Sequence, residues 1–335
     1  MHIGLTYDLK TSFDLKPGLP EDIAEEYDSV ETVQLISSSL EALGHTVIHL
    51  GGGLEFLSNM CAGTDAELVF NISEGRGNYP SREAQVPSVL EMYNIPYTGS
   101  SPQCLSICLD KPLTKHILKA SGIVTPHWLV VSDKQSADRV SWDNIGFPLV
   151  VKPAHEGSSI GIHNCSLAQN VQEAKALCTT SLVGYNQPVM IEQYISGREV
   201  TVGIIGSHKP DVLGIMEIKP KHRHEMFMYS IEVKRDYVNQ VDYECPANLP
   251  KTVLEEIKKT SLKIYSLLGC LDMARLDFRI DKQGQPYFIE INPLPGLGNH
   301  SDLVIMASFL GISHQSLIQM ILSAALERYP QCIQI

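Results

Sequence analysis

Short apolar segments alternate with helical segments along this chain, and the alternation limits its fold more than any other feature. The segments His2–Tyr7, Thr46–Leu50 and Glu67–Asn71 have the length of strands, and Glu31–Gly44 has the pattern of a helix that ends at glycine. A strand, a helix and a second strand in this order predict a unit of parallel sheet. The alternation continues to the C-terminus, so we expect an α/β protein of about two or three domains.

Composition and charge exclude several classes of protein. Hydrophobic residues make up 44% of the chain and charged residues 19%, which is enough apolar surface for a packed core and excludes a disordered chain. The net charge of −12 disfavours binding to nucleic acid or to anionic membranes. The sequence shows no secretory signal pattern and no apolar run of about 20 residues, so we expect a cytoplasmic protein.

The cysteines do not form a recognisable metal motif. The chain has eight of them, and no pair has CxxC spacing. Cys104 and Cys108 stand four residues apart, which is one turn of a helix, but no His or Cys pattern in the sequence completes a zinc set. We therefore expect buried, reduced thiols.

A predicted hairpin near the C-terminus carries polar residues at every second position of both strands. Arg275 and Asp277 lie on one strand, and Glu290 and Asn292 lie on the other. Because side chains two residues apart share a face, pairing would gather two carboxylates, an amide and a guanidinium. Such oxygen donors suit Mg²⁺, and the apolar neighbours favour a metal site over a solvated strand face.

A lysine precedes a Gly/Ser loop in the segment 152–162. Backbone N–H groups and hydroxyls of such a loop can hold a triphosphate while Lys152 neutralises it, although Gly-Ser-Ser also occurs in ordinary loops. Glu192 and Glu199 lie on two consecutive strand segments, where they could hold an adenine edge and a pair of ribose hydroxyls. Taken singly, these glutamates are more typical of surface charges.

Taken together and in this order, the segments resemble the ATP-grasp superfamily, and within it the D-alanine–D-alanine ligase family. The resemblance covers most of the chain and rests on the motifs Pro96–Ser100, Asp110–Lys115, Lys152–Ile162, Glu192–Thr201, Arg275–Asn292 and Pro295–Ser301. It implies a three-domain ATP-grasp fold: an N-terminal Rossmann-like substrate domain (1–101), a central subdomain (102–191), and a C-terminal subdomain with the metal site (192–335).

The resemblance also implies which residues bind ATP and metal. The implied ATP-binding residues are Lys111, Lys152, Gly157, Ser158, Ser159, Glu192, Ile195, Glu199 and Lys234. In this assignment the lysines neutralise the phosphates, the Gly/Ser loop closes over them, and the glutamates hold the adenine and the ribose. The implied ligands of Mg²⁺, or of Mn²⁺, are Asp277, Glu290 and Asn292.

Catalytic roles follow from the same resemblance. Arg275 and the backbone N–H of Gly296 would stabilise a tetrahedral oxyanion, with Lys234 and Ser158 also at the reaction centre. Ser301 would bind the carboxylate of the incoming amino acid. The implied enzyme is an ATP-dependent carboxylate–amine ligase that acts on small-molecule carboxylate and amino-acid substrates and forms a homodimer.

The chemistry of such a ligase requires protection from water. ATP converts a carboxylate to an acyl phosphate, and an amine then displaces phosphate to leave an amide. Because water hydrolyses an acyl phosphate, a segment must close over the site. We expect the polar stretch Lys219–Pro246 to be this closing loop.

The sequence departs from the family pattern at the substrate end. The N-terminal Gly-Gly-x-Ser-x-Glu signature is absent, so a carboxylate for the substrate amine would come from Glu25 or Glu31. Glu74 stands in a segment that replaces the Leu-His-Gly motif. Arg235 replaces a usual tyrosine, and Asp302 replaces a usual apolar residue. We therefore expect these charges to bear on substrate choice, and D-alanine with D-alanine to be a poor substrate pair.

Three interpretations stay open from the sequence. The enzyme could make a dipeptide for cell walls, or it could join an amino acid to a specialised metabolite such as a precursor of mycosporine-like amino acids. An alternative of another class is a nucleotide-binding regulator that has lost catalysis. The full set of site residues disfavours the regulator, because a binding protein has no need of an oxyanion arginine.

Overall fold

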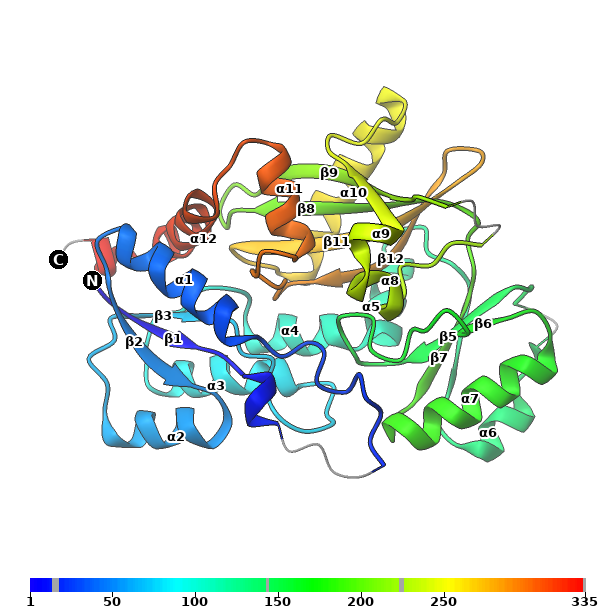
Figure 1. Ribbon diagram of the computed structural model, residues 1–335, viewed down its shortest axis with the longest axis horizontal. Helices are drawn as coiled ribbons and strands as arrows, with labels where there is room; N and C mark the ends of the chain where they lie inside the picture. Colours follow the sequence, from blue (N-terminus) through cyan, green and yellow to red (C-terminus); the bar gives the residue numbers. More distant parts are fainter. Residues whose placement is uncertain (14–17, 143–144, 223–225, 334–335) are drawn as a thin grey trace.

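Three sheets, each covered by helices, make up the molecule (Figure 1). The structure is a computed structural model that describes residues 1–13, 18–142, 145–222 and 226–333. The expected α/β class is confirmed. The expected closing loop includes residues 223–225, which lie outside the described part of the chain.

The N-terminal sheet is parallel, with strand order β2-β1-β3. Its elements are β1 (His2–Thr6), α1 (Val30–Ala42), β2 (Thr46–Gly51), α2 (Gly53–Ala62), β3 (Leu68–Asn71) and α3 (Gln85–Met92). Helix α1 begins after Ser29, whose hydroxyl accepts a hydrogen bond from the backbone N–H of Thr32 at 3.2 Å. The predicted parallel unit is therefore confirmed.

The central sheet is antiparallel, with strand order β4-β7-β5-β6. Its strands are β4 (Trp128–Val131), β5 (Leu149–Pro153), β6 (Leu167–Ala168) and β7 (Val189–Gln193). The helices of this part are α4 (Pro102–Leu109), α5 (Lys111–Ala120), α6 (Lys134–Arg139) and α7 (Val171–Tyr185). Asp110 caps α5 by accepting from the backbone N–H of Leu113 at 2.9 Å, and this places Lys111 at the first position of the helix.

The C-terminal sheet has strand order β10-β9-β8-β11-β12. Its strands are β8 (Gly197–Ile205), β9 (Asp211–Pro220), β10 (Val241–Glu244), β11 (Met273–Asp281) and β12 (Pro286–Asn292). The helices are α8 (Ile231–Arg235), α9 (Tyr237–Gln240), α10 (Lys251–Leu268), α11 (Asp302–Phe309) and α12 (His314–Arg328). Strands β11 and β12 form the predicted hairpin, with Arg275 opposite Asn292 and Asp277 opposite Glu290.

The expected closing loop contains more regular structure than a polar loop with weak periodicity suggests. Helices α8 and α9 and strand β10 all lie within it, and β10 pairs with β9 at the edge of the sheet. Val233 and Val241 pack with Ile218 of β9 in a small apolar cluster, which holds the segment against the sheet. The sequence interpretation was wrong on this point, because helices of one turn leave too short a periodic pattern to detect.

The last helix returns to the N-terminal sheet (Figure 1). Leu317 and Ile321 of α12 share one apolar core with Ile36 of α1 and Ile3 and Leu5 of β1. The two ends of the chain therefore stabilise each other. Within the described residues, no single helix has the length and hydropathy of a membrane span, and α11 and α12 reach them only as a pair bent by 111°.

Candidate active site

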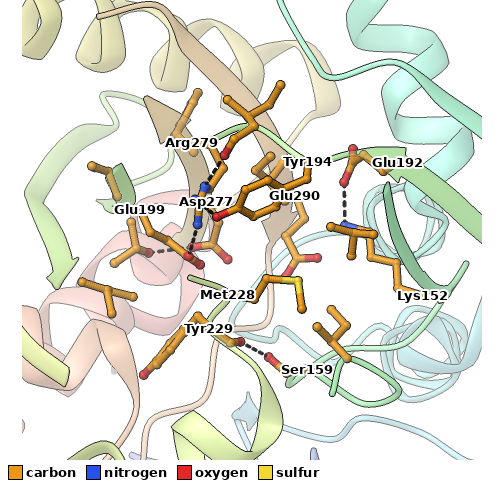
Figure 2. Close-up of a pocket in the computed structure, with 18 of the residues that line it drawn as sticks. Lys152, Ser159, Glu192, Tyr194, Glu199, Met228, Tyr229, Asp277, Arg279 and Glu290 are labelled. Carbon is orange, nitrogen blue, oxygen red and sulfur yellow. Dashed lines mark hydrogen bonds and ion pairs between the residues drawn. The ribbon is translucent and has the colours of Figure 1, made fainter. Parts of the chain in front are cut away.

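A pocket lies between the central and the C-terminal sheets (Figure 2). Strands β5, β7, β8, β11 and β12 contribute to its wall, so residues far apart in the sequence meet there. Ten of the predicted site residues line it: Lys152, Ser159, Glu192, Ile195, Glu199, Lys234, Arg275, Asp277, Glu290 and Asp302.

A second pocket adjoins the first and shares part of its wall. The shared residues are Tyr229, Lys234, Arg275 and Asp302. The second pocket is also lined by the predicted residues Glu74, Ser158, Asn292, Gly296 and Ser301. Lys111 and Gly157 line a third pocket, which shares Ser158, Glu290 and Asn292 with its neighbours. The three pockets therefore bring together the predicted site residues except Arg235 and the two glutamates considered for the substrate amine, Glu25 and Glu31.

Two lysines hold the carboxylate of Glu192 at one end of the first pocket. Lys152 Nζ lies 2.9 Å from one carboxylate oxygen, and Lys115 Nζ lies 2.5 Å from the other. Burial would raise the pKa of Glu192, but the two ammonium groups lower it below its usual range. Burial lowers the pKa of Lys115 to about 8 despite its carboxylate partner. Glu192 is thus ionised and held in a fixed orientation.

Lys115 is a site residue that the sequence interpretation missed. Its ammonium group also donates to Thr125 Oγ1 at 2.6 Å and to the backbone carbonyl of Phe288 at 3.1 Å. Through these contacts and its ion pair with Glu192, it links α5, β7 and β12 behind the pocket. Its position one helical turn after Lys111, on the buried face of an amphipathic helix, is the signal that could have identified it.

The hairpin residues form a buried network of opposite charges. Arg275 Nη2 lies 3.0 Å from Asp277 Oδ2, and Thr201 donates to Asp277 Oδ1 at 2.7 Å. Lys111 Nζ lies 3.5 Å from Glu290 Oε2. Burial would raise the pKa of Glu290, but nearby cations, Lys111 first among them, lower it to about 2. An ionised carboxylate therefore faces the cavity next to its cross-strand partner Asp277.

Arg275 is held between two carboxylates. Asp302 Oδ2 lies 3.5 Å from Arg275 Nη1, on the side of the guanidinium away from Asp277. Tyr229 donates to Asp302 Oδ1 at 3.3 Å, and the hydroxyls of Tyr229 and Tyr243 are 2.6 Å apart. Burial lowers the pKa of Arg275, but its carboxylate partners more than compensate and raise it overall. The guanidinium is therefore a fixed positive charge at the wall between the two pockets.

The Gly/Ser loop is hydrogen-bonded to two neighbouring segments of the chain. Ser158 and Ser159 adopt positive φ angles of 48° and 61°, which turn the loop sharply. Ser159 Oγ donates to the backbone carbonyl of Tyr229 at 3.0 Å (Figure 2), which links the loop to the segment before α8. Gly161 N–H donates to Asp22 Oδ2 at 2.8 Å, which links the loop to the N-terminal part of the chain.

A second ion pair orients the carboxylate of Glu199, which the sequence predicts to bind the ribose of ATP. Arg279 Nη1 donates to Glu199 Oε2 at 2.7 Å, and Arg279 Nε donates to the carbonyl of Ile195 at 3.0 Å (Figure 2). Burial raises the pKa of Glu199, and Arg279 opposes this shift. Arg279 was not among the predicted residues, although it follows Asp277 at the two-residue spacing that places both on one face.

The residues predicted to bind the substrates are the ones whose positions differ most from expectation. Glu26, and neither Glu25 nor Glu31, lines the second pocket. Glu25 instead pairs with Arg235 at 3.1 Å, and the Arg235 side chain is 45% exposed. Glu31 is exposed on the first turn of α1. Arg235 therefore joins α8 to the N-terminal segment from outside, and its effect on substrate choice stays a proposal.

Gly296 lies close to the side chain of Ser301. A Cβ atom at this position would lie 2.8 Å from Ser301 Oγ. The backbone of Gly296 and the hydroxyl of Ser301 thus approach each other on one side of the second pocket. On another side stands Glu74, whose pKa is raised well above the usual value by burial and by the neighbouring Glu26.

Comparison with known proteins identifies the family. A model described as the C-terminus of D-ala D-ala ligase matches residues 117–323, more than half of the chain. A D-alanine–D-alanine ligase from Desulforamulus reducens is 30% identical over 318 residues, which cover 91% of this chain and 96% of that protein. An uncharacterised protein from Sinorhizobium fredii is 36% identical over 263 residues, 78% of this chain and 75% of its own.

Solved structures agree with the sequence matches. The crystal structure of D-alanine–D-alanine ligase from Bacillus anthracis in complex with ATP superposes with a TM-score of 0.75 and 26% identity, over 99% of both chains. The predicted ATP-grasp fold and the predicted use of ATP are confirmed by these matches. They favour an enzyme over the inactive regulator. The chain belongs to the D-alanine–D-alanine ligase family of the ATP-grasp superfamily, and it is an ATP-dependent ligase that forms carbon–nitrogen bonds.

Proposed function

We propose that ATP occupies the first pocket, that two small substrates meet in the second, and that phosphate transfer takes place at the wall between them. The observation that carries this proposal is that Lys234 and Arg275 line both pockets. A phosphate arriving from one side and a carboxylate from the other would both face these cations. Positive charge at this point stabilises a transferring phosphoryl group.

For nucleotide binding, we assign the phosphates to Lys111, Lys152 and the Gly/Ser loop. Lys152 lies between the carboxylate that we assign to adenine, Glu192, and Glu290, whose pKa it helps to lower. Glu199, oriented by Arg279, would accept hydrogen bonds from the ribose hydroxyls, with Ile195 as part of the pocket wall.

The hairpin residues fit a divalent cation. Asp277 and Glu290 lie opposite each other in the hairpin, Asn292 adds an amide oxygen two residue pairs away, and Glu290 is ionised. Hard oxygen donors of this kind suit Mg²⁺ or Mn²⁺. Asp277, Glu290 and Asn292 would hold the ion, which when bound neutralises charge on the phosphate oxygens.

For ligation, we assign the developing oxyanion to Arg275 and to the backbone N–H of Gly296. A donor that is already fixed by Asp277 and Asp302 needs no reorientation during the reaction. Ser301 would bind the carboxylate of the attacking amino acid, and Ser158 and Glu26 would orient the first substrate. Helix α8, which carries the half-buried Lys234, would exclude water from the acyl phosphate.

For substrate choice, the relatives from Desulforamulus reducens and Bacillus anthracis are D-alanine–D-alanine ligases, and we propose that this enzyme prefers a different acceptor. The observation that favours this is Asp302, a buried carboxylate at the wall of the second pocket. Although Asp302 already contacts Arg275 and Tyr229, it offers the pocket a further hydrogen-bond acceptor that the methyl side chain of D-alanine leaves unused. An acceptor with an amine or hydroxyl on its side chain would satisfy it.

The test is phosphate release from ATP with a panel of D- and L-amino acids, alone and in pairs. We expect release to need two substrates and to be highest with a polar or cationic acceptor. Asp302→Leu should shift the preference toward paired D-alanine by about tenfold, while the isosteric Asp302→Asn should keep the preference for hydroxyl acceptors. Efficient ligation of paired D-alanine by the unaltered enzyme would contradict the proposal and favour dipeptide synthesis.

We also propose that the enzyme works in the cytoplasm as a homodimer, without nucleic acid or membrane partners. The net charge of −12 supports the absence of nucleic-acid and membrane partners, and the eight free cysteines, all within the described residues, support the cytoplasm. The homodimer rests on the family resemblance alone. Light scattering of the purified protein tests the oligomeric state, and a monomer at micromolar concentration would contradict it.

A further inference from the structure

Three cysteine thiols meet in the core beside the active site. Cys104 and Cys108 lie one turn apart on α4, and Cys270, which follows α10, faces them. The Sγ atom of Cys104 is 3.6 Å from that of Cys270 and 3.9 Å from that of Cys108. All three sulfur atoms lie within 4.8 Å of one another, and the residues are at most 4% exposed. The sequence showed only the first two, because Cys270 is far away along the chain.

The spacing of the sulfur atoms fits one ion with three ligands. With bonds of about 2.3 Å and angles of about 100–120° at the ion, sulfur ligands stand about 3.5–4.0 Å apart. The distances of 3.6 Å and 3.9 Å fall in this range. The third pair, Cys108 and Cys270, lies within 4.8 Å, so small side-chain movements bring all three sulfur atoms to one ion. Thiolate ligands select soft, thiophilic ions.

The surroundings favour an ion of charge +3. The three thiols belong to the apolar core formed by α4, α10 and strands β8, β11 and β12. Three thiolates carry three negative charges, and a net charge in an apolar core is costly. A trivalent ion gives a neutral complex, whereas Zn²⁺ or Cu⁺ does not.

We propose that Cys104, Cys108 and Cys270 form a binding site for a trivalent thiophilic ion, of which arsenic(III) is the representative. Arsenous acid, As(OH)₃, reacts with three thiols to give As(SR)₃ and three molecules of water. Three As–O bonds break and three As–S bonds form, each thiol proton leaves with a hydroxide as water, and arsenic stays in the +3 state.

An entry route and a structural effect follow from the position of the site. Cys108 lines the third pocket together with Lys111 and Glu290, so one of the three cysteines borders the active-site cavity. Cys108 precedes Lys111 by three residues, and Cys270 precedes Arg275 by five. A bound ion would therefore link the helix that leads to a proposed phosphate-binding lysine with the strand that carries the oxyanion arginine.

The test is arsenite uptake by the full-length protein, kept reduced with a phosphine and carrying Cys61→Ser and Cys165→Ser to remove the two exposed thiols. Native mass spectrometry should show a gain of one arsenic atom and a loss of three hydrogen atoms, and the melting temperature should rise. Cys270→Ser and Cys108→Ser, each made separately, should weaken binding about a hundredfold. Cys178→Ser, which removes a buried thiol from another core, should leave it unchanged.

Three outcomes would overturn the proposal. They are no uptake by the protein with all three thiols, uptake with loss of fewer than three hydrogen atoms, and uptake that neither Cys270→Ser nor Cys108→Ser weakens. Binding of Zn²⁺ more tightly than arsenite would also overturn it, because the charge argument predicts the reverse order. The free thiol content of each variant, measured after unfolding, confirms that the tested protein was reduced.

Discussion

At the scale of single residues, the site depends on charges that would be costly to bury alone. Lys115, Lys152 and Glu192 share one buried network, and Arg275 shares another with its two carboxylates. Removing one member of such a network leaves an uncompensated charge, which costs more than the loss of a surface ion pair. Substitutions at these residues should therefore change both binding and stability.

Lys115 provides the clearest case. Lys115→Met leaves Glu192 with one cationic partner instead of two, so we expect a loss of about 3–5 kcal/mol in the free energy of unfolding and a KM for ATP raised about tenfold. Urea unfolding and initial rates measure the two effects. Lys119→Met, an exposed position one turn later on α5, is the matched control and should change neither. Equal behaviour of the two variants would remove Lys115 from the site.

Glu290 gives a prediction about pH. Its folded pKa of about 2 lies below the ordinary value of 4.5, so its ionisation stabilises the fold fully above about pH 5, and this contribution is lost as the pH falls toward 2. Glu290→Gln should therefore be less stable than the unaltered protein at neutral pH, and the gap should narrow between about pH 5 and about pH 3. Thermal unfolding across this range measures it, and a gap independent of pH would contradict the assignment. The variant should also form no detectable ADP.

At the scale of elements, local pattern decided what could be predicted. The hairpin of β11 and β12 follows from period-two polarity around a Lys-Gln-Gly turn, so the pairing of Asp277 with Glu290 was predictable. Helices α8 and α9 were not predictable, because such short helices contain no repeating pattern of apolar residues. Their packing depends on a cluster with β9, which is a long-range contact.

Helix α8 carries two consecutive cationic side chains, and they point to different surroundings. Lys234 is half-buried and lines both pockets, whereas Arg235 is exposed and pairs with Glu25. Lys234→Met should lower kcat about a hundredfold or more, whereas Arg235→Met, which loses only a surface ion pair worth about 0–1 kcal/mol, should change it less than about threefold. Steady-state kinetics with saturating ATP compares them. A larger effect from Arg235 would place that side chain, not Lys234, at the reaction.

At the scale of the whole molecule, residues far apart in the sequence contact each other in ways that no local pattern predicts. Asp272 precedes the hairpin and accepts from Gly99 N–H at 2.7 Å and from Arg328 of α12 at 2.6 Å, so it joins the N-terminal part, the C-terminal sheet and helix α12. The sequence motifs indicated the family and most of the site. Glu26 and Cys270 could not be predicted, because each reaches its neighbours only through the arrangement of the sheets.

The central claim is that a carboxylate oxygen of one substrate attacks ATP at the wall between the pockets. The most direct measurement uses the substrate pair with the highest ADP release, with the carboxylate of the first substrate labelled with oxygen-18. An acyl phosphate intermediate predicts that each amide formed is accompanied by one phosphate that carries one labelled oxygen. Phosphate without label, released at the same rate as the amide, would contradict the account.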